Sequence, residues 1–445
     1  MNRLVTESKI QKIVEGQLLD QIPKLYSRLL KGDLLSYEQE LSYRVQMIYN
    51  KVSKLLLEEC SKELLPKLKE RAKEEGLCRL RKRPLQIQLG TGYVVSVKNW
   101  YANTIPPTYS SQRHMLANYW NILGNSSISY IDKVCMSSVL CPSYNIANQL
   151  LIRFGIRQSI TRVRKLTNKV ATHCQDLEVQ LSLSAGETLK SKRVILGIDG
   201  GRVRTRIYTK KKNELDNAMY ETPWREPKLF VIHVIDGQGK LDSKTLPIYG
   251  CRFSEDKMLS LLASYLSALK IEQCKQVQLL ADGAPWIWNT VPNLLAELGV
   301  SSDRLILTLD YYHAINYVHK LVDSLPKRYS QKKRKEFLKQ FTIQLWQGKS
   351  QEIAATCKTL YKRPSKLVKR WMNYLDKHNE KTHYADYQAD KLMCGSGIIE
   401  SGIRRIINLK FKSPSIFWKE DQVERLFFSI YFSFATMGDF YQKPK

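Results

Sequence analysis

Val194-Ile195-Leu196-Gly197-Ile198-Asp199-Gly200-Gly201 is the stretch around which the second half of the chain is organised. Its first five residues are apolar or small without interruption, which predicts a strand buried on both faces. Asp199 would end this strand, and the two glycines predict a turn. Most strand-end aspartates are turn residues or helix caps, but a carboxylate that ends a central, buried strand is a candidate for chemistry.

Six further elements are predicted after this strand. Strands are expected over 203–209, 229–235, 277–281 and 305–309, and helices over 253–269 and 285–298. Three strands in succession indicate a meander, and strands separated by helices indicate crossover units. The sequence therefore predicts an α/β core with a mixed five-stranded sheet.

Two more aspartates follow predicted strands: Asp282 after 277–281 and Asp310 after 305–309. If the first and fourth strands are neighbours, the carboxylates of Asp199 and Asp282 converge, and they repel each other unless a cation lies between them. A divalent metal ion is the simplest answer, because hard cations take oxygen ligands. Asp236, in the turn sequence Asp-Gly-Gln-Gly, is assigned no chemistry.

A third acid is predicted on a helix near residue 400. Ile399, Ile403 and Ile406 mark one buried face, and Glu400 lies beside that face near the helix start. The small residues Gly397, Ser401 and Gly402 would let this helix approach a sheet or a DNA backbone closely. Alternatively, Glu400 is a helix N-terminal charge favoured by the dipole, which does not explain the glycines.

The N-terminal part is predicted to be mainly helical. Over residues 1–80, apolar residues recur at steps of three and four. A packed helical hairpin is favoured over a dimerisation element, because neither apolar run sustains the heptads of a coiled coil. Residues 81–135 are interpreted as a small β-hairpin and loop module, since alternating apolar residues flank Gly90-Thr91-Gly92.

Residues 136–185 contain two predicted helices with a break. Ser143 and Ser159 are expected to be N-caps, and Gly155 provides the turn. This is the pattern of a helix-turn-helix that enters the DNA major groove, although two capped amphipathic helices also occur in other α-helical domains. The second helix presents the basic residues Arg162, Arg164 and Lys165.

The composition indicates an anionic partner. The 445 residues include 71 Lys or Arg and 42 Asp or Glu, which gives a net charge of +29 and is typical of proteins that bind nucleic acid or an anionic membrane surface. The start of the chain has no apolar signal-peptide core, and the longest apolar stretch, 426–437, is too short to span a bilayer. Nine cysteines without a CxxC pair indicate reduced thiols. Zinc binding at Cys135 and Cys141 is a minor alternative. The expected partner is double-stranded DNA, and the expected location of the protein is the cytoplasm.

Four motifs, in this order, resemble those of bacterial insertion-sequence DDE transposases of the Mutator-like superfamily. They are Ile198-Asp199-Gly200-Gly201-Arg202, Ala281-Asp282-Gly283-Ala284, Asp310-Tyr311-Tyr312-His313 and Gly395-Ser396-Gly397-Ile398-Ile399-Glu400-Ser401. The resemblance covers residues 193–418. It implies an RNase H-like catalytic domain in two segments, 190–313 and 394–445, separated by an α-helical insertion over 314–393.

For the chemistry, the resemblance implies a DDE triad of Asp199, Asp282 and Glu400. These carboxylates would hold two Mg²⁺ ions, for which Mn²⁺ could substitute, during strand cleavage at the inverted repeats of a mobile element and strand transfer into target DNA. Acting on two ends implies a homodimer or higher oligomer. His313 would contact DNA or pack under the site. Residues expected to bind DNA or assist are Asp310, His313, Arg162, Arg164, Lys165, Arg404, Arg405, Lys410, Lys412 and Trp418.

Two other functions stay open. One is an RNase H-like structure-selective nuclease that hydrolyses DNA without strand transfer, and the other is a catalytically silent, domesticated DNA-binding protein. The end-binding helices and the insertion argue against the first, and the intact set of three acids argues against the second. Relatives with these motifs tend to carry paired cysteines in the N-terminal region, whereas this chain has none that are paired.

Overall fold

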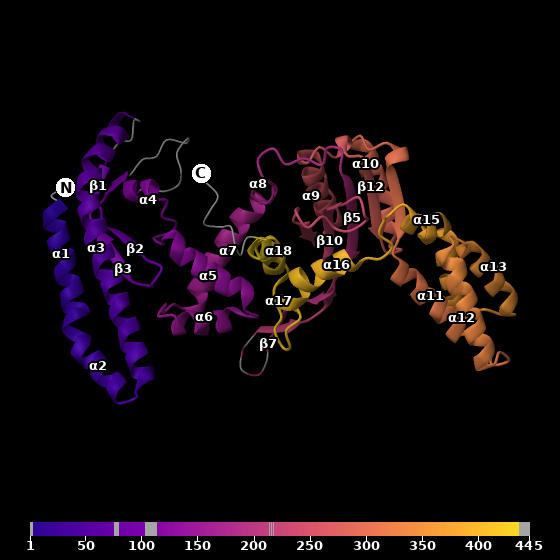
Figure 1. Ribbon diagram of the computed structural model, residues 1–445, viewed down its shortest axis with the longest axis horizontal. Coiled ribbons are helices and arrows are strands. Elements are labelled where there is room, and N and C mark those ends of the chain that lie inside the picture. Colours follow the sequence, from indigo (N-terminus) through magenta and orange to yellow (C-terminus); the bar gives the residue numbers. More distant parts are fainter. Residues whose placement is uncertain are drawn as a thin grey trace. The chain divides into compact units, whose positions relative to one another are not determined.

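The computed structural model describes residues 3–74, 80–102, 114–212, 214, 216 and 218–435 (Figure 1). The chain forms two compact units, Met1–Thr167 and Asn168–Lys445. In the first unit, α1 (Arg3–Gln17) and α2 (Ile22–Leu30) pack along the long helix α3 (Leu34–Glu74). The predicted helical hairpin is therefore confirmed.

A β-hairpin packs against α3 at the predicted place. β2 (Leu85–Gln88) and β3 (Val94–Val97) pair antiparallel, and Gly92 in their turn has a φ of +82°, which favours glycine. Apolar residues of both strands form a core with leucines of α3 and with α4 (Met115–Tyr119). β1 (Leu80–Lys82) pairs with β4 (Trp100–Ala102) beside them.

The first unit closes with α5 (Ile128–Leu140), α6 (Tyr144–Arg153) and the start of α7 (Ile160–Asp176). Ser143 Oγ accepts the Ile146 N–H at 3.2 Å, and Ser159 Oγ accepts the Arg162 N–H at 3.2 Å. Gly155 lies between the helices with a φ of +81°. Both predicted caps and the predicted break are confirmed.

A mixed five-stranded sheet is the centre of the second unit, as predicted. Its order is β11-β10-β5-β12-β13, in which β10 runs antiparallel to both neighbours and β5, β12 and β13 are parallel. The strands are β5 (Arg193–Gly200), β10 (Lys228–Ile235), β11 (Ile248–Arg252), β12 (Gln276–Ala281) and β13 (Leu305–Leu309).

The prediction of one strand in this sheet is wrong. Residues 203–209 form no part of it: β6 (Val203–Arg204) pairs with β9 (Trp224–Arg225), and β7 (Ile207–Lys212) pairs with β8 (Ala218–Glu221). The edge position belongs to β11, which the sequence hides because Gly250 interrupts it. That glycine makes room for the ring of Phe230, which a Cβ at this position would overlap.

Helices cover both faces of the sheet. α9 (Glu255–Ala268) and α10 (Pro285–Glu297) share an apolar core with Val194, Leu196 and Ile198 of β5. On the other face, α16 (Gly397–Gly402) packs on β5 and β10, and a π-helical turn, η5 (Ile403–Asn408), continues it towards α17 (Leu409–Phe411). α18 (Glu420–Ala435) then packs on β11.

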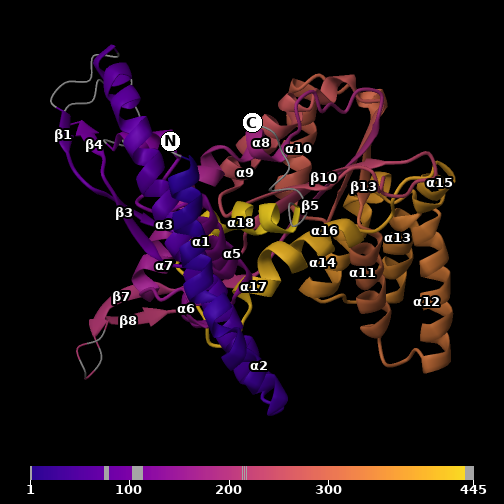
Figure 2. The ribbon, with the colours of Figure 1, turned by 60° about the vertical axis from the view of Figure 1, so that its left-hand side comes forward.

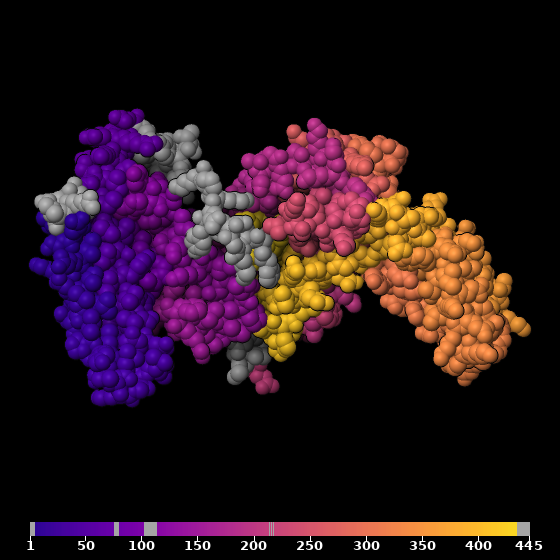
Figure 3. Space-filling model, in the orientation of Figure 1, coloured from indigo at the N-terminus to yellow at the C-terminus, as the bar shows by residue number. Residues whose placement is uncertain are grey.

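The segment between β13 and α16 is helical, as predicted. It comprises α11 (Tyr311–Asp323), α12 (Gln331–Trp346), α13 (Ser350–Leu360), α14 (Lys366–Lys377) and α15 (Tyr384–Ala389). These helices have their own apolar core and form the orange lobe beside the sheet (Figures 1 and 3). Tyr384 and Tyr387 donate their hydroxyls to the backbone carbonyls of Leu309 and Leu307, both at 3.0 Å, which fixes the lobe to edge strand β13.

Candidate active site

Asp199 and Asp282 lie at the same level on neighbouring strands. β5 and β12 run parallel with Ile198 opposite Ala281, and the two aspartates are the next residues. Ile198 and Ala281 face the core beneath α9 and α10. Because side chains alternate along a strand, both aspartates project to the opposite face, on which α16 packs.

The electrostatics of this pair favour a cation. Burial, followed by the neighbouring charge of Asp282, raises the pKa of Asp199 from 3.8 to about 6. The Gly200 N–H, which donates to Asp199 Oδ1 at 2.7 Å, and the charge of His313 oppose this rise. A positive ion between the two carboxylates would relieve both their repulsion and their loss of solvation.

The loop that carries Asp282 is fixed by local hydrogen bonds. Asp282 Oδ1 accepts the Ala284 N–H at 2.9 Å, and the Asp282 carbonyl accepts the indole N–H of Trp288 at 2.7 Å. Pro285 begins α10 directly afterwards, where its missing N–H costs nothing. The strand end and the helix start therefore hold this carboxylate in place.

Asp310 is fully buried and joins two helices. Its Oδ1 accepts the Tyr312 N–H at 3.1 Å, which caps α11, and the Ser396 N–H at 3.2 Å. Its Oδ2 accepts the Ser396 hydroxyl at 2.8 Å and is bonded to His313 Nδ1. Ser396 is the residue before α16, so Asp310 fastens the start of α16 to the start of α11.

His313 is the positive group of the site. Its hydrogen bond to Asp310 raises the pKa of the imidazole from 6.5 to about 8, against the effect of burial, and Asp199 and Asp282 add to the rise. Burial would raise the pKa of Asp310, but the bonds from His313 and Ser396 outweigh it and lower that pKa. A pKa of about 8 favours the charged form of His313 at neutral pH.

Glu400 is the third predicted acid, and it is not assembled with the two aspartates. Its side chain is exposed, and its Oε1 lies 3.5 Å from the hydroxyl of Ser396, one turn earlier. Within the described parts of the chain, no three His, Cys, Asp or Glu side chains gather closely enough to hold a metal ion. Sequence reasoning assigned no role to Ser396, although its spacing of four residues from Glu400 placed both on one helix face.

Small residues let α16 approach the sheet. A Cβ at Gly402 would stand 2.9 Å from Leu229 Cδ2, and one at Gly197 would stand 2.9 Å from Val231 Cγ1 and 3.5 Å from Ile399. The expected close approach is confirmed for Gly402. Gly397 has open space around it, so its absence of a side chain does not serve packing.

The basic segment after Glu400 divides into surface and interior residues. Arg404, Arg405 and Lys412 are exposed. Lys410 and Trp418 are only 3% and 4% exposed, and Lys410 Nζ lies 4.6 Å from the centre of the Trp418 ring. Both are core residues, so we do not assign DNA contacts to them.

The helix-turn-helix candidates also differ from one another. Arg164 and Lys165 are exposed on α7. Arg162 is exposed as well, but its Nη2 donates to Gln88 Oε1 at 3.1 Å and to Ser126 Oγ at 3.4 Å. Arg162 thus ties α7 to the β-hairpin, a role the sequence did not indicate.

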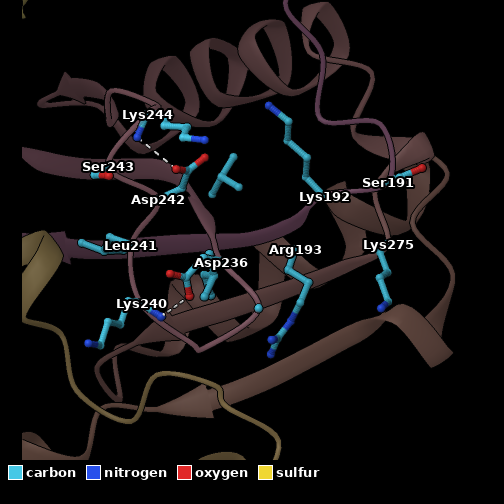
Figure 4. A pocket seen from close by; sticks show the side chains of 13 residues that line it. Ser191, Lys192, Arg193, Asp236, Lys240, Leu241, Asp242, Ser243, Lys244 and Lys275 are labelled. Atoms are coloured by element: carbon cyan, nitrogen blue, oxygen red, sulfur yellow. Dashed lines mark hydrogen bonds between the residues drawn. The ribbon is translucent and has the colours of Figure 1, made fainter.

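A second polar feature lies at the opposite end of β5 (Figure 4). A cavity of about 800 Å³ is lined by five basic residues and by Asp236 and Asp242. Asp236 Oδ1 accepts the Gln238 and Lys240 N–H groups, as expected for a turn residue. Arg193 and Asp199 stand at opposite ends of β5, roughly 20 Å apart at the usual rise per residue, so this cavity is not part of the carboxylate site. The five bases are Lys192, Arg193, Lys240, Lys244 and Lys275.

The sequence matches no protein-family model and no curated protein significantly. Among solved structures, the chain is similar to the Drosophila P element transposase strand transfer complex, at 12% identity over 70% of this chain and 80% of that one, with a TM-score of 0.26. None of the helices in the described ranges is long and apolar enough to cross a membrane.

Proposed function

We propose that this chain is a DDE-type transposase, which binds the ends of a mobile DNA element and catalyses strand cleavage and strand transfer. The observation that supports this most directly is the pairing of Asp199 and Asp282 at one level of a buried parallel strand pair. The mixed sheet is compatible with an RNase H-like core, and the net charge of +29 suits a DNA partner.

The donor set fits Mg²⁺. Asp199 and Asp282 provide hard oxygen donors, and this ion needs only one or two carboxylates because water and phosphate oxygens complete its shell. When bound, such ions stabilise the entering and leaving oxygens of phosphoryl transfer. In this proposal Glu400 would join the two aspartates as the third acid from α16, which packs on the face to which they project.

His313 would hold the phosphate. Asp310 engages Nδ1, so the remaining donor, Nε2–H, which has no hydrogen-bond partner among the described residues, would bond a non-bridging phosphate oxygen. Because the charged form of the imidazole is favoured at neutral pH, this bond would be charge-assisted. Asp310 orients the ring and does not itself need to touch DNA.

The test uses the purified full chain, Mg²⁺ or Mn²⁺, and DNA that carries the element's own ends. Cleavage followed by joining, both lost in Asp282→Asn, is the expected result. Cleavage without joining would instead identify a nuclease. Binding without cleavage, unchanged in Asp282→Asn, would identify a catalytically silent DNA-binding protein.

A further inference from the structure

The segment mispredicted as a sheet strand forms a two-stranded arm outside the main sheet. Its base is joined to the segment at the start of α18 by the Arg206 N–H bond to the Trp418 carbonyl (2.8 Å) and by the Arg225–Glu420 ion pair (2.6 Å). β7 and β8 pair only with each other, with Tyr208 opposite Tyr220 and an irregular register towards Lys212. Figure 2 shows them projecting away from the main sheet. Almost every residue of both strands is exposed. We call residues 202–212 and 218–225 the β-arm.

An isolated two-stranded ribbon has no face buried on a core and is marginally stable in water. The β-arm nevertheless keeps large apolar side chains at its surface: Tyr208, Tyr220 and Met219 are 44–46% exposed and Trp224 is 57% exposed. Side chains of this size on both strands indicate that a partner covers the arm.

The charge of the first strand of the arm points to the kind of partner, although Lys212 is paired with Asp216 at 2.7 Å. Residues 202–212 contain six bases and no acid, because arginines at 202, 204 and 206 precede three lysines at 210–212. The lysines are exposed. Such a one-sign strand repels a second copy of itself and attracts a polyanion.

Cations and aromatic rings are interleaved along the arm. The Arg206 guanidinium lies 5.0 Å from the Tyr208 ring and 5.4 Å from the Tyr220 ring, and Lys419 Nζ lies 5.2 Å from Tyr208. At the base of the arm, Arg204 stacks on Trp224 at 5.7 Å and donates to the Thr222 hydroxyl at 2.7 Å. These contacts hold the arginines extended beside the rings, so binding would order few additional side chains.

We propose that the β-arm is a DNA-binding element that enters the major groove of double-stranded DNA. The major groove is about 12 Å wide and admits a two-stranded β-ribbon. Lys210 and Lys211 would contact the phosphates along the groove, and Tyr208 and Tyr220 would contact base edges. This assignment rests on the proposed function for its choice of DNA, and it adds a contact element that is separate from the carboxylate site.

Binding of the full chain to element-end DNA, measured in EDTA over a range of salt concentrations, tests the proposal. Lys210→Ser/Lys211→Ser should weaken binding at least tenfold and reduce the slope of log Kd against log salt by about 2, since each phosphate contact contributes about 0.9. Lys190→Ser/Lys275→Ser removes the same charge from exposed sites elsewhere in the same unit and should leave both values unchanged. Tyr220→Ser should weaken binding without changing the slope.

A chemical-protection experiment tests whether the β-arm occupies the major groove. The wild-type chain should protect guanine N7, which faces the major groove, from dimethyl sulfate, and the double lysine variant should lose part of that protection. The proposal is overturned if this variant binds like the control variant, or if it changes the oligomeric state by light scattering while DNA binding persists. Binding is measured in EDTA, so its result does not depend on cleavage. A lack of cleavage in the separate assay with Mg²⁺ or Mn²⁺ would count against the proposed function and not against the β-arm.

Discussion

The ring of Tyr374 occupies the space that a side chain at Gly283 would need. A Cβ built on Gly283 would stand 2.6 Å from Tyr374 Cζ, closer than packed atoms allow. Tyr374 belongs to α14 of the helical insertion and stacks on Tyr317 of α11, with ring centres 4.0 Å apart. Since Gly283 follows Asp282, the insertion directly contacts the loop that carries a proposed catalytic acid.

Gly283→Ala should therefore separate the insertion from that loop. We expect a loss of about 1–3 kcal/mol in the free energy of unfolding, as for other overpacking substitutions, and a larger loss of DNA cleavage than of DNA binding. Chemical denaturation and the cleavage assay measure the two effects. Gly397→Ala is the matched stability control, because its Cβ would meet nothing within 4 Å; equal destabilisation by both changes would contradict the steric explanation.

Asp199→Asn and Asp282→Asn should each abolish strand cleavage, by a factor of 10³ or more, and leave DNA binding intact. Each change also removes one of two repelling carboxylates. In EDTA at pH 7, both variants should therefore melt at a higher temperature than the wild-type chain. Differential scanning calorimetry decides this point, and a lower melting temperature would mean that the carboxylates do not repel each other.

Ser396→Ala should loosen the start of α16. It removes the hydroxyl bond to Asp310 and the contact with Glu400, so we expect a loss of about 1–2 kcal/mol in stability and roughly tenfold slower cleavage as Glu400 loses its position. Ser401→Ala, on the same helix, serves as the control. If the two variants cleave DNA equally fast, Ser396 does not position Glu400.

His378 gives a pH dependence to the insertion. Burial lowers the pKa of this histidine from 6.5 to about 4, so below pH 6.5 the unfolded chain binds a proton that the folded chain does not. Stability is then complete above pH 6.5 and falls as the pH drops towards 4, by roughly 1–2 kcal/mol between pH 7 and pH 5.

His378→Phe should remove this dependence without loss of stability at pH 7. The histidine packs against Trp288 and Tyr374, and its buried Nδ1 has no hydrogen-bond partner among the described residues. Urea unfolding followed by tryptophan fluorescence at pH 5 and pH 7 measures the difference. A slope with pH that persists in the variant would assign it to another group.

Local sequence predicts a helix or strand correctly where a single pattern of apolar residues or caps dominates. The prediction fails where the local pattern and the tertiary packing favour different structures. The uninterrupted apolar run before Asp199 predicts its central strand correctly, and serine caps predict α6 and α7. Residues 203–209 alternate like a half-buried strand, yet they pair outside the main sheet, with segments that follow them closely in the chain. β11 contains Gly250, whose role depends on Phe230 and Leu261, residues that only tertiary packing brings near.

The site shows the same limit. Strand-end spacing predicted the Asp199–Asp282 pair, because parallel strands bring their ends together. The role of Asp310 depends on Ser396, 86 positions away along the chain. A contact over such a sequence distance has no local signature.

The tyrosine hydroxyls on β13 have a consequence for self-association. An open sheet edge presents unpaired carbonyls that another chain's strand could pair with. On β13, Tyr384 and Tyr387 already bond the carbonyls of Leu309 and Leu307, and the lobe stands where an incoming strand would lie. A second copy of this chain therefore cannot extend the sheet across this edge, and any assembly of copies on DNA under the proposed function would have to use other surfaces.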